Sequence, residues 1–163
     1  MKERLKYSII ILCMLCLCNY SSFGQGVKFP LQKGWVNDYE GLFTAQQHDE
    51  LNSLIADFEQ RTNREIALVT LENIKPYTNL NDYSKDLSYN WSLTKEELKN
   101  GLIIIVSKSL RTVRITTAYG THQLIRDDIC RNIINNEMLP AYSIGNYYGG
   151  TKQGLISLMR QWH

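Results

Sequence analysis

The chain alternates between stretches whose apolar residues recur every three or four positions and stretches that are apolar throughout. The first helical stretch begins after Thr44, which can cap it, ends near Thr62 and Asn63, and has its apolar positions at Leu51, Leu54, Ile55 and Phe58. The run EIALVTL (65–71) follows it. This run is mostly apolar and of strand length, so it predicts a strand buried on both faces.

The second half of the chain repeats these patterns. A second helix is predicted from Asn79 or Asn81, and residues 92–100 form a polar connection with a short helical turn. GLIIIV (101–106) predicts a buried strand, whereas TVRITTA (112–118) alternates and predicts a strand with one wetter face; residues 107–111 make the hairpin between them. Two more helices are predicted over 125–137, stopped before Pro140, and over 145–162.

The order of these elements predicts the fold class. Helix, strand, helix, buried hairpin, helix and helix is the order of an α/β protein. We expect a three-layer α/β/α sandwich in which helices cover both faces of a small mixed β-sheet. In such sheets ligands bind beside the carboxyl ends of the strands, where the loops gather.

The N-terminus has the pattern of a secretory signal peptide over residues 1–24. Basic residues at Lys2, Arg4 and Lys6 precede an apolar run over 9–18, which is shorter than the roughly 20 residues of a membrane span. Cleavage after Gly24 predicts an exported chain, periplasmic or extracellular, with no membrane span. The alternative is a lipoprotein anchor on Cys16 or Cys18, although a leucine precedes each cysteine where a small residue is expected.

Removal of the signal peptide changes the charge and the cysteine content. The mature chain has 18 − 3 = 15 basic and 16 − 1 = 15 acidic residues, so no basic excess argues for a nucleic-acid partner. Cys130 is the one cysteine left, which excludes an internal disulfide and predicts a buried, unreactive thiol. Residues 25–34 lack a period and contain Gly26, Pro30 and Gly34, so we expect a linker before a single domain over 35–163.

The chain resembles the TPM domain family. The resemblance rests on VNDYEGLFT (36–44) before a helix, on NGLIIIVSKSLRTVRITTAYG (100–120), and on an acidic residue that opens the helix ending in IINNEMLPAY (133–142). It implies a sheet between helices in an exported domain of the bacterial envelope or the thylakoid lumen. It also implies three activities known in the family: weak acid phosphatase activity, calcium binding, and an auxiliary role in membrane complexes.

The resemblance also implies site residues. The acidic positions of the family fall on Asp38 and Asp127, and with Asn100 they are expected to form a weak calcium site. Lys99 and His122 replace two acids of the family pattern, which lowers the expected affinity. The alternative is that Asp38 and Asp127 only cap a turn and a helix. Residues expected to line the same cleft are Tyr119, Gly120, His122, Asp128 and Arg114.

Two functions follow as hypotheses. The first is a monomeric ligand-binding or protein-interaction module with an unidentified envelope protein as partner, because Tyr142, Tyr147 and Tyr148 lie among glycines and tyrosine is a good contact residue. The second is a weak acid phosphatase. Arg111, Arg114 and Arg126 could supply positive charge to a phosphoryl group, but the sequence has no P-loop and no paired acidic motif.

Overall fold

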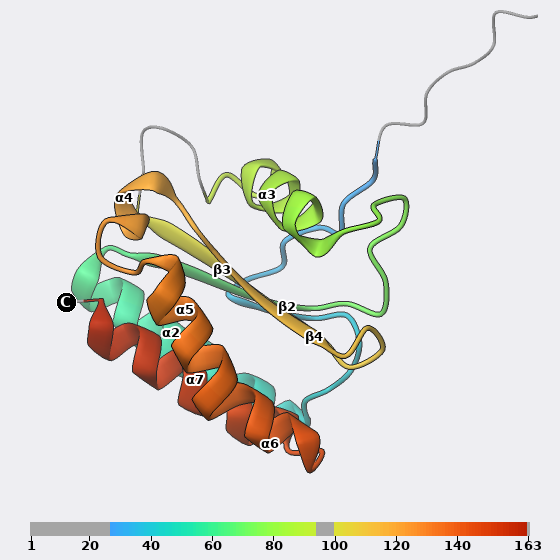
Figure 1. Ribbon diagram of the computed structural model, residues 1–163. Helices are drawn as coiled ribbons and strands as arrows, with labels where there is room; N and C mark the ends of the chain where they lie inside the picture. The colour runs from blue at the N-terminus through green and yellow to red at the C-terminus, as the bar shows by residue number, and fades with distance from the viewer. Residues whose placement is uncertain (1–26, 94–99, 163) are drawn as a thin grey trace, which may run out of the picture.

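The computed structural model describes residues 27–93 and 100–162 (Figure 1). Its elements, in chain order, are β1 Val36–Asp38, α2 Ala45–Thr62, β2 Glu65–Thr70, α3 Leu80–Asn90, β3 Gly101–Ser107, β4 Thr112–Thr117, α4 Tyr119–His122, α5 Asp127–Ile133, the π-helix η1 Ile134–Met138, α6 Leu139–Ser143 and α7 Tyr147–Gln161. The expected signal peptide, Lys99 and the polar turn after Leu93 lie outside the described residues, wholly or in part.

The four strands form one sheet in the order β1-β2-β3-β4. β1, β2 and β3 are parallel, with Asp38 beside Thr70 and Thr70 beside Val106. β4 returns antiparallel to β3, so that Ser107 pairs with Thr112 at one end of the hairpin and Leu102 with Thr117 at the other. The mixed sheet that the sequence predicts is confirmed.

Helices cover both faces of the sheet, as expected of a three-layer sandwich (Figure 1). On one face α2 and the helices from α5 to α7 pack against every second strand residue, and the buried side chains there include Leu51, Phe58, Ile104, Leu155 and Trp162. On the other face α3 and its flanking loops pack against Ala67, Val69, Ile103 and Ile105. All seven residues of β3 are buried, which explains its uninterrupted apolar sequence.

The helix starts follow the predicted caps. The Thr44 hydroxyl accepts from the Gln47 amide at 3.3 Å while the Gln47 side chain accepts from the Thr44 amide at 3.0 Å, which forms a complete capping box. Asn63 ends the same helix in the left-handed conformation at φ 55°. Asn79, one of the two predicted starts, caps α3 through the Asp82 amide at 2.9 Å.

The helix predicted to stop before Pro140 continues past it. Proline has no N–H, and in an α-helix its ring would meet the carbonyl four residues earlier. The chain widens here into η1, where the Leu139 amide bonds to the Ile134 carbonyl, and Pro140 lies in the first turn of α6. The helix also begins at Asp127 and not at Ile125, because α4 precedes it.

The segment expected to be a linker packs against the domain. The Phe29 ring lies 5.6 Å from the Tyr83 ring, and the Trp91 indole N–H donates to the Pro30 carbonyl at 2.9 Å. The strand β1 just after it was not predicted, since three residues are too few for a strand pattern. Strand β1 thus extends the sheet, and the segment before it extends the packing on the α3 face, toward the N-terminus.

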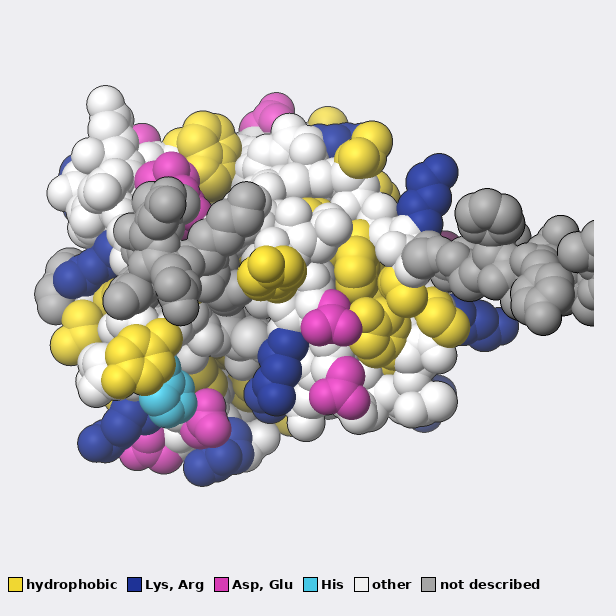
Figure 2. All heavy atoms as spheres, turned by 90° about the horizontal axis from the view of Figure 1, so that it is seen from above, with side chains coloured by type: hydrophobic (Ala, Val, Ile, Leu, Met, Phe, Trp, Pro, Cys, Tyr) yellow, Lys and Arg dark blue, Asp and Glu magenta, His cyan; other side chains and the backbone are white. Residues whose placement is uncertain are grey.

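The described surface carries mixed charge. On the α3 face, acidic and basic side chains are interspersed among polar and apolar ones (Figure 2). Within residues 27–93 and 100–162, none of the helices has the length and apolar character that crossing a membrane requires.

Two glycines of α7 give a matched test of how closely α7 packs against η1 and α6. A Cβ on Gly150 would lie 2.8 Å from the Met138 carbonyl oxygen and 2.7 Å from the Tyr142 ring, both held in place, whereas on Gly154 it would meet the flexible Met138 side chain at 2.7 Å. Gly150→Ala should lower the free energy of unfolding by about 1–3 kcal/mol in urea denaturation. Gly154→Ala should lower it by less, because alanine's helix propensity offsets part of a contact that Met138 can relieve. Equal losses would contradict the packing described here.

Candidate functional site

The parallel strands β1, β2 and β3 end together at one edge of the sheet. Beside their carboxyl ends lies a cavity of about 990 Å³, which we name the strand-end pocket. Its lining comes from the loops after β1 and β2, from the β3–β4 hairpin and from the α6–α7 region, at Glu40, Gly41, Leu42, Glu72, Ser107, Lys108, Ser109, Arg111, Thr112, Leu139, Tyr142, Ser143 and Tyr147. This is where an open α/β sheet binds its ligands.

Asp38, the last residue of β1, fixes the loop that follows. Its carboxylate accepts hydrogen bonds from the backbone amides of Leu42 at 3.0 Å and Phe43 at 2.9 Å, and also from the Thr70 hydroxyl at the end of β2. Charge-assisted bonds of this kind are stronger than neutral ones. Asp38 therefore caps a turn, which is one of the two roles that the sequence left open.

Glu40 joins this loop to the hairpin. Its carboxylate accepts from the amides of Lys108 at 2.9 Å and Ser109 at 2.7 Å, and from the Ser109 hydroxyl at 2.6 Å. Its own amide donates to the Thr70 hydroxyl at 2.9 Å. Through one side chain, two segments 68 residues apart in sequence are held in a fixed relation at the pocket.

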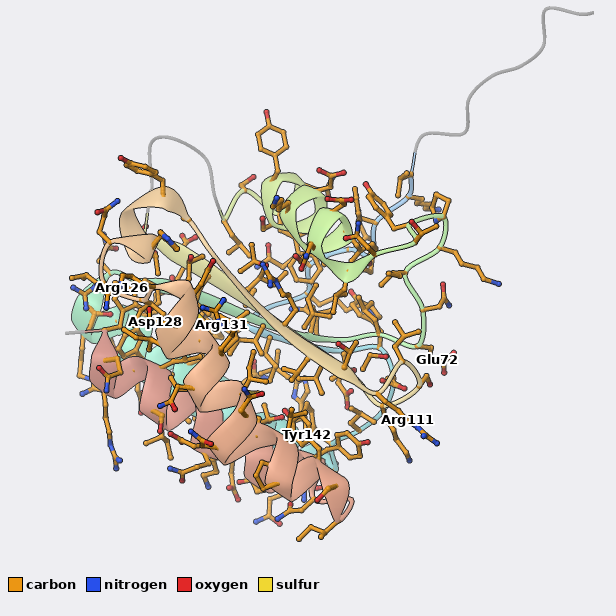
Figure 3. All side chains as sticks on the ribbon, in the orientation of Figure 1. Glu72, Arg111, Arg126, Asp128, Arg131 and Tyr142 are labelled. Atoms are coloured by element: carbon orange, nitrogen blue, oxygen red, sulfur yellow. The ribbon has the colours of Figure 1, made fainter. Side chains whose placement is uncertain are left out.

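Three charged side chains at the pocket form no salt bridge. Within the part of the chain that the structure describes, none of Lys108, Arg111 and Glu72 has an oppositely charged group within 4 Å. Figure 3 shows Glu72 and Arg111 at the same end of the molecule, with Tyr142 on the helical side. Arg111 has a left-handed backbone, at φ 51°. These groups are open to a ligand of complementary charge.

The helical wall of the pocket is aromatic. The rings of Tyr142 and Tyr147 stack with their centroids 4.9 Å apart. The Tyr142 hydroxyl is buried and lies 2.8 Å from that of Thr151, and burial raises its pKa well above the usual range. Tyr142 is therefore a neutral structural wall, and Tyr147 is its more exposed partner. Tyr148, the third tyrosine that the sequence suggested, instead donates to Glu50 on the surface.

Asp38, Asn100 and Asp127 do not converge in the structure, which therefore does not bring together the three residues expected to share one calcium ion. Asn100 precedes β3 and Asp127 opens α5 beyond the end of β4, so both lie at the opposite edge of the sheet from Asp38. The seven residues of β3 span roughly 20 Å between these edges. Calcium ligands lie about 2.3–2.6 Å from the ion, so the three residues do not fit a common ion.

The residues expected to line the same cleft lie mainly around α4, and none of them lines the strand-end pocket. The Tyr119 side chain is 76 % exposed, and Gly120 follows it in α4. His122 Nδ1 lies 3.3 Å from the Thr117 hydroxyl and 3.9 Å from the Asp127 carboxylate. Arg114 lies in the middle of β4.

Asp128 lies in the first turn of α5. Its carboxylate lies 3.3 Å from the Arg126 guanidinium, whose hydrogen bond holds the pKa of Asp128 below its usual range. It also lines a smaller cavity of about 370 Å³ between α5 and α7. Cys130, in the same helix, is buried, and desolvation raises its pKa to about 11, so its thiol stays protonated at neutral pH.

Sequence reasoning missed the residues that organise the pocket. The sequence patterns do not single out Glu40 or Glu72, and they place Lys108 only in the hairpin. The sequence does contain a signal for these two glutamates, because each follows the end of a parallel strand by two residues. It could be used only once β1 was recognised as a strand. Among residues 27–93 and 100–162, no group of three or more His, Cys, Asp or Glu side chains is placed to hold a metal ion.

Comparisons with known proteins agree with this fold. The family model described as TPM domain matches residues 36–161. The N-terminal domain of a protein from P. gingivalis, solved by NMR, is 28% identical with a TM-score of 0.72, over 78% of this chain and 80% of that one. The comparison with curated proteins gives no match.

Two further solved structures show the fold alone. The BA42 protein from Bizionia argentinensis is 22% identical with a TM-score of 0.65, over 76% of this chain and 83% of that one. The N-terminal domain of a Corynebacterium glutamicum protein is 16% identical with a TM-score of 0.62, over 84% and 86% of the two chains.

Substitutions of the two aspartates distinguish a turn cap from a metal ligand. Asp38→Asn removes one acceptor for the Leu42 and Phe43 amides and should lower the free energy of unfolding by about 1–2 kcal/mol without calcium. Asp127→Asn, at a carboxylate that is 68% exposed, should lower it by less than about 1 kcal/mol. Urea denaturation measures both.

Calcium titration of the melting temperature provides the control. If both aspartates held one ion, either substitution would weaken its binding, and both variants would lose the same calcium-dependent rise in melting temperature. That outcome would contradict the separation of the two residues.

Proposed function

Because this chain belongs to the TPM domain family, we propose that it is exported to the cell envelope and acts there as a ligand-binding or protein-interaction module. The strand-end pocket is the surface that we assign to this role. The signal-peptide pattern of residues 1–24 supports the proposed export. A monomeric mature domain is part of the same proposal.

One observation carries the proposal. A cavity of about 990 Å³ lies at the carboxyl ends of three parallel strands, and it combines an aromatic and apolar wall with three charged side chains that form no salt bridge within the described chain. Binding sites combine a mostly apolar lining with a few placed polar groups. Desolvating unpaired charges is costly unless a ligand supplies the opposite charge, so such groups favour a complementary ligand.

The alternative is a weak acid phosphatase. Lys108 and Arg111 favour it, since both line the pocket and could stabilise the charge of a phosphoryl group. Hydrolysis also needs a nucleophile or an activated water. Two carboxylates line the pocket, and one of them, Glu40, already accepts hydrogen bonds from backbone amides, which leaves Glu72 as the lining carboxylate that could activate a water. A binding role therefore accounts for more of the geometry.

Calcium binding stays a prediction for this chain. The residues first expected to hold the ion lie at opposite edges of the sheet, so a calcium effect, if measured, would come from a different donor set.

Site-specific photo-crosslinking in the native host tests the proposed surface. A benzoylphenylalanine replaces Ser143, which is exposed and lines the pocket, in the full chain with its signal sequence. The same residue replaces Gln123, which is also exposed and follows α4, as the matched control. We expect a discrete adduct, identified by mass spectrometry, from position 143 and none from position 123. Adducts from both positions, or from position 123 alone, would contradict the assignment of the pocket.

A further inference from the structure

Arg111 occupies a backbone conformation that its residue type rarely adopts. The four-residue loop between Ser107 and Thr112 closes with a left-handed residue, and Arg111 supplies it at φ 51°. Glycine or asparagine meets this requirement with less steric cost. Strained residues of this kind cluster at functional sites, so a long cationic side chain at this position indicates a use for the guanidinium.

The position of Arg111 is fixed before any ligand arrives. Glu40 holds the two residues that begin the hairpin loop, and the Leu110 amide donates to the Ser107 hydroxyl at 3.0 Å. The Arg111 amide closes the turn on the Lys108 carbonyl at 3.1 Å. A preorganised loop loses less entropy on binding. The planar guanidinium offers paired N–H donors that match the two oxygens of a carboxylate.

The other charges of the pocket set how much negative charge it accepts. Lys108 adds one cation, while Glu72 and Glu40 add two carboxylates to the same lining. The balance is close to neutral, so a single carboxylate on Arg111 is tolerated. A phosphate, with close to two negative charges at neutral pH, meets repulsion from both glutamates.

Apolar groups lie beside these charges. Leu139 and Tyr147 line the helical side of the pocket, and the exposed Leu110 and Ile144 are the chain neighbours of lining residues. Ile144 is 81% exposed. Exposed apolar side chains close to a pocket in the chain are available to pack against a protein partner.

We propose that the strand-end pocket binds a peptide segment of a partner protein, in which Arg111 pairs with one aspartate or glutamate carboxylate while a neighbouring apolar side chain packs against Leu139 and Tyr147. This inference rests on the proposed function and adds the chemistry of the partner. Arg111 is the residue that determines specificity for the carboxylate.

Three synthetic peptides test the inference by titration of the ¹⁵N-labelled domain in NMR. Their sequences are acetyl-Gly-Leu-Asp-Leu-Gly-amide, the same peptide with Asn in place of Asp, and the same peptide with phosphoserine there. We expect saturable shifts at Arg111, Ser109 and Tyr147 with the aspartate peptide. Binding of the neutral peptide and of the phosphopeptide should be at least about tenfold weaker.

Arg111→Gly separates binding from stability. Glycine suits the left-handed position, so the melting temperature should stay close to that of the wild type, while the aspartate peptide should bind at least about tenfold more weakly. Arg131→Ala, an exposed arginine of α5 outside the pocket lining, should leave the affinity unchanged. Undiminished binding by Arg111→Gly would overturn the inference.

The remaining outcomes separate this inference from the proposed function. Tighter binding of the phosphopeptide would make the pocket a phosphate site and would overturn the choice of a carboxylate. No binding of any peptide to the wild type, together with a specific crosslink from position 143, would refute the acidic segment but leave the pocket as the interaction surface. Loss of both signals would refute the two proposals together.

Discussion

The candidate site depends on two carboxylates that follow the short strand β1. Asp38 turns the chain by accepting two backbone amides, and Glu40, two residues later, accepts two more from the hairpin tip. Thr70 connects them, because its hydroxyl donates to Asp38 and accepts from the Glu40 amide. Without these bonds the loop after β1 and the β3–β4 hairpin would be connected only through the sheet. Arg111 would then have no fixed position relative to the helical wall of the pocket.

The helical wall has its own requirement for close packing. Tyr142 can stand at the pocket because α7 approaches it through Gly150, where any side chain would meet the ring. The π-helix before Pro140 has a related effect, since it lets the helix continue past a residue that would otherwise end it and carries the chain on to Tyr142. Gly150 and Pro140, two residues that are unfavourable in helices, thus help to position Tyr142 in the aromatic wall of the pocket.

Local patterns predicted most of the fold because they report burial directly. The period of α2, its cap at Thr44 and the uninterrupted apolar run of β3 each reflect one environment, and the structure confirms them. The helix end predicted before Pro140 is wrong because the widened turn that accommodates this proline depends on tertiary packing. The three residues of β1 carry no period, so their strand state follows from pairing with β2.

The site was harder to predict because it depends on strand direction. Asn100 and Asp38 both lie near strand ends, but one precedes β3 and the other closes β1, so a parallel sheet places them at opposite edges. The resemblance to a family points to Asp38, whose carboxylate fixes the loop that carries Glu40, but it does not point to Glu40 itself. The role proposed for Arg111 rests in part on a backbone angle that no sequence pattern reports.

Hydrogen exchange measured by NMR tests the central claim, that Glu40 holds the hairpin in place. In Glu40→Gln the amide protons of Lys108 and Ser109 should exchange at least about tenfold faster than in the wild type, since a neutral amide oxygen accepts more weakly than a carboxylate. The amide of Ile104 in the centre of β3 should keep its protection. Unchanged protection of Lys108 and Ser109 would show that the hairpin is rigid without Glu40 and would contradict the account.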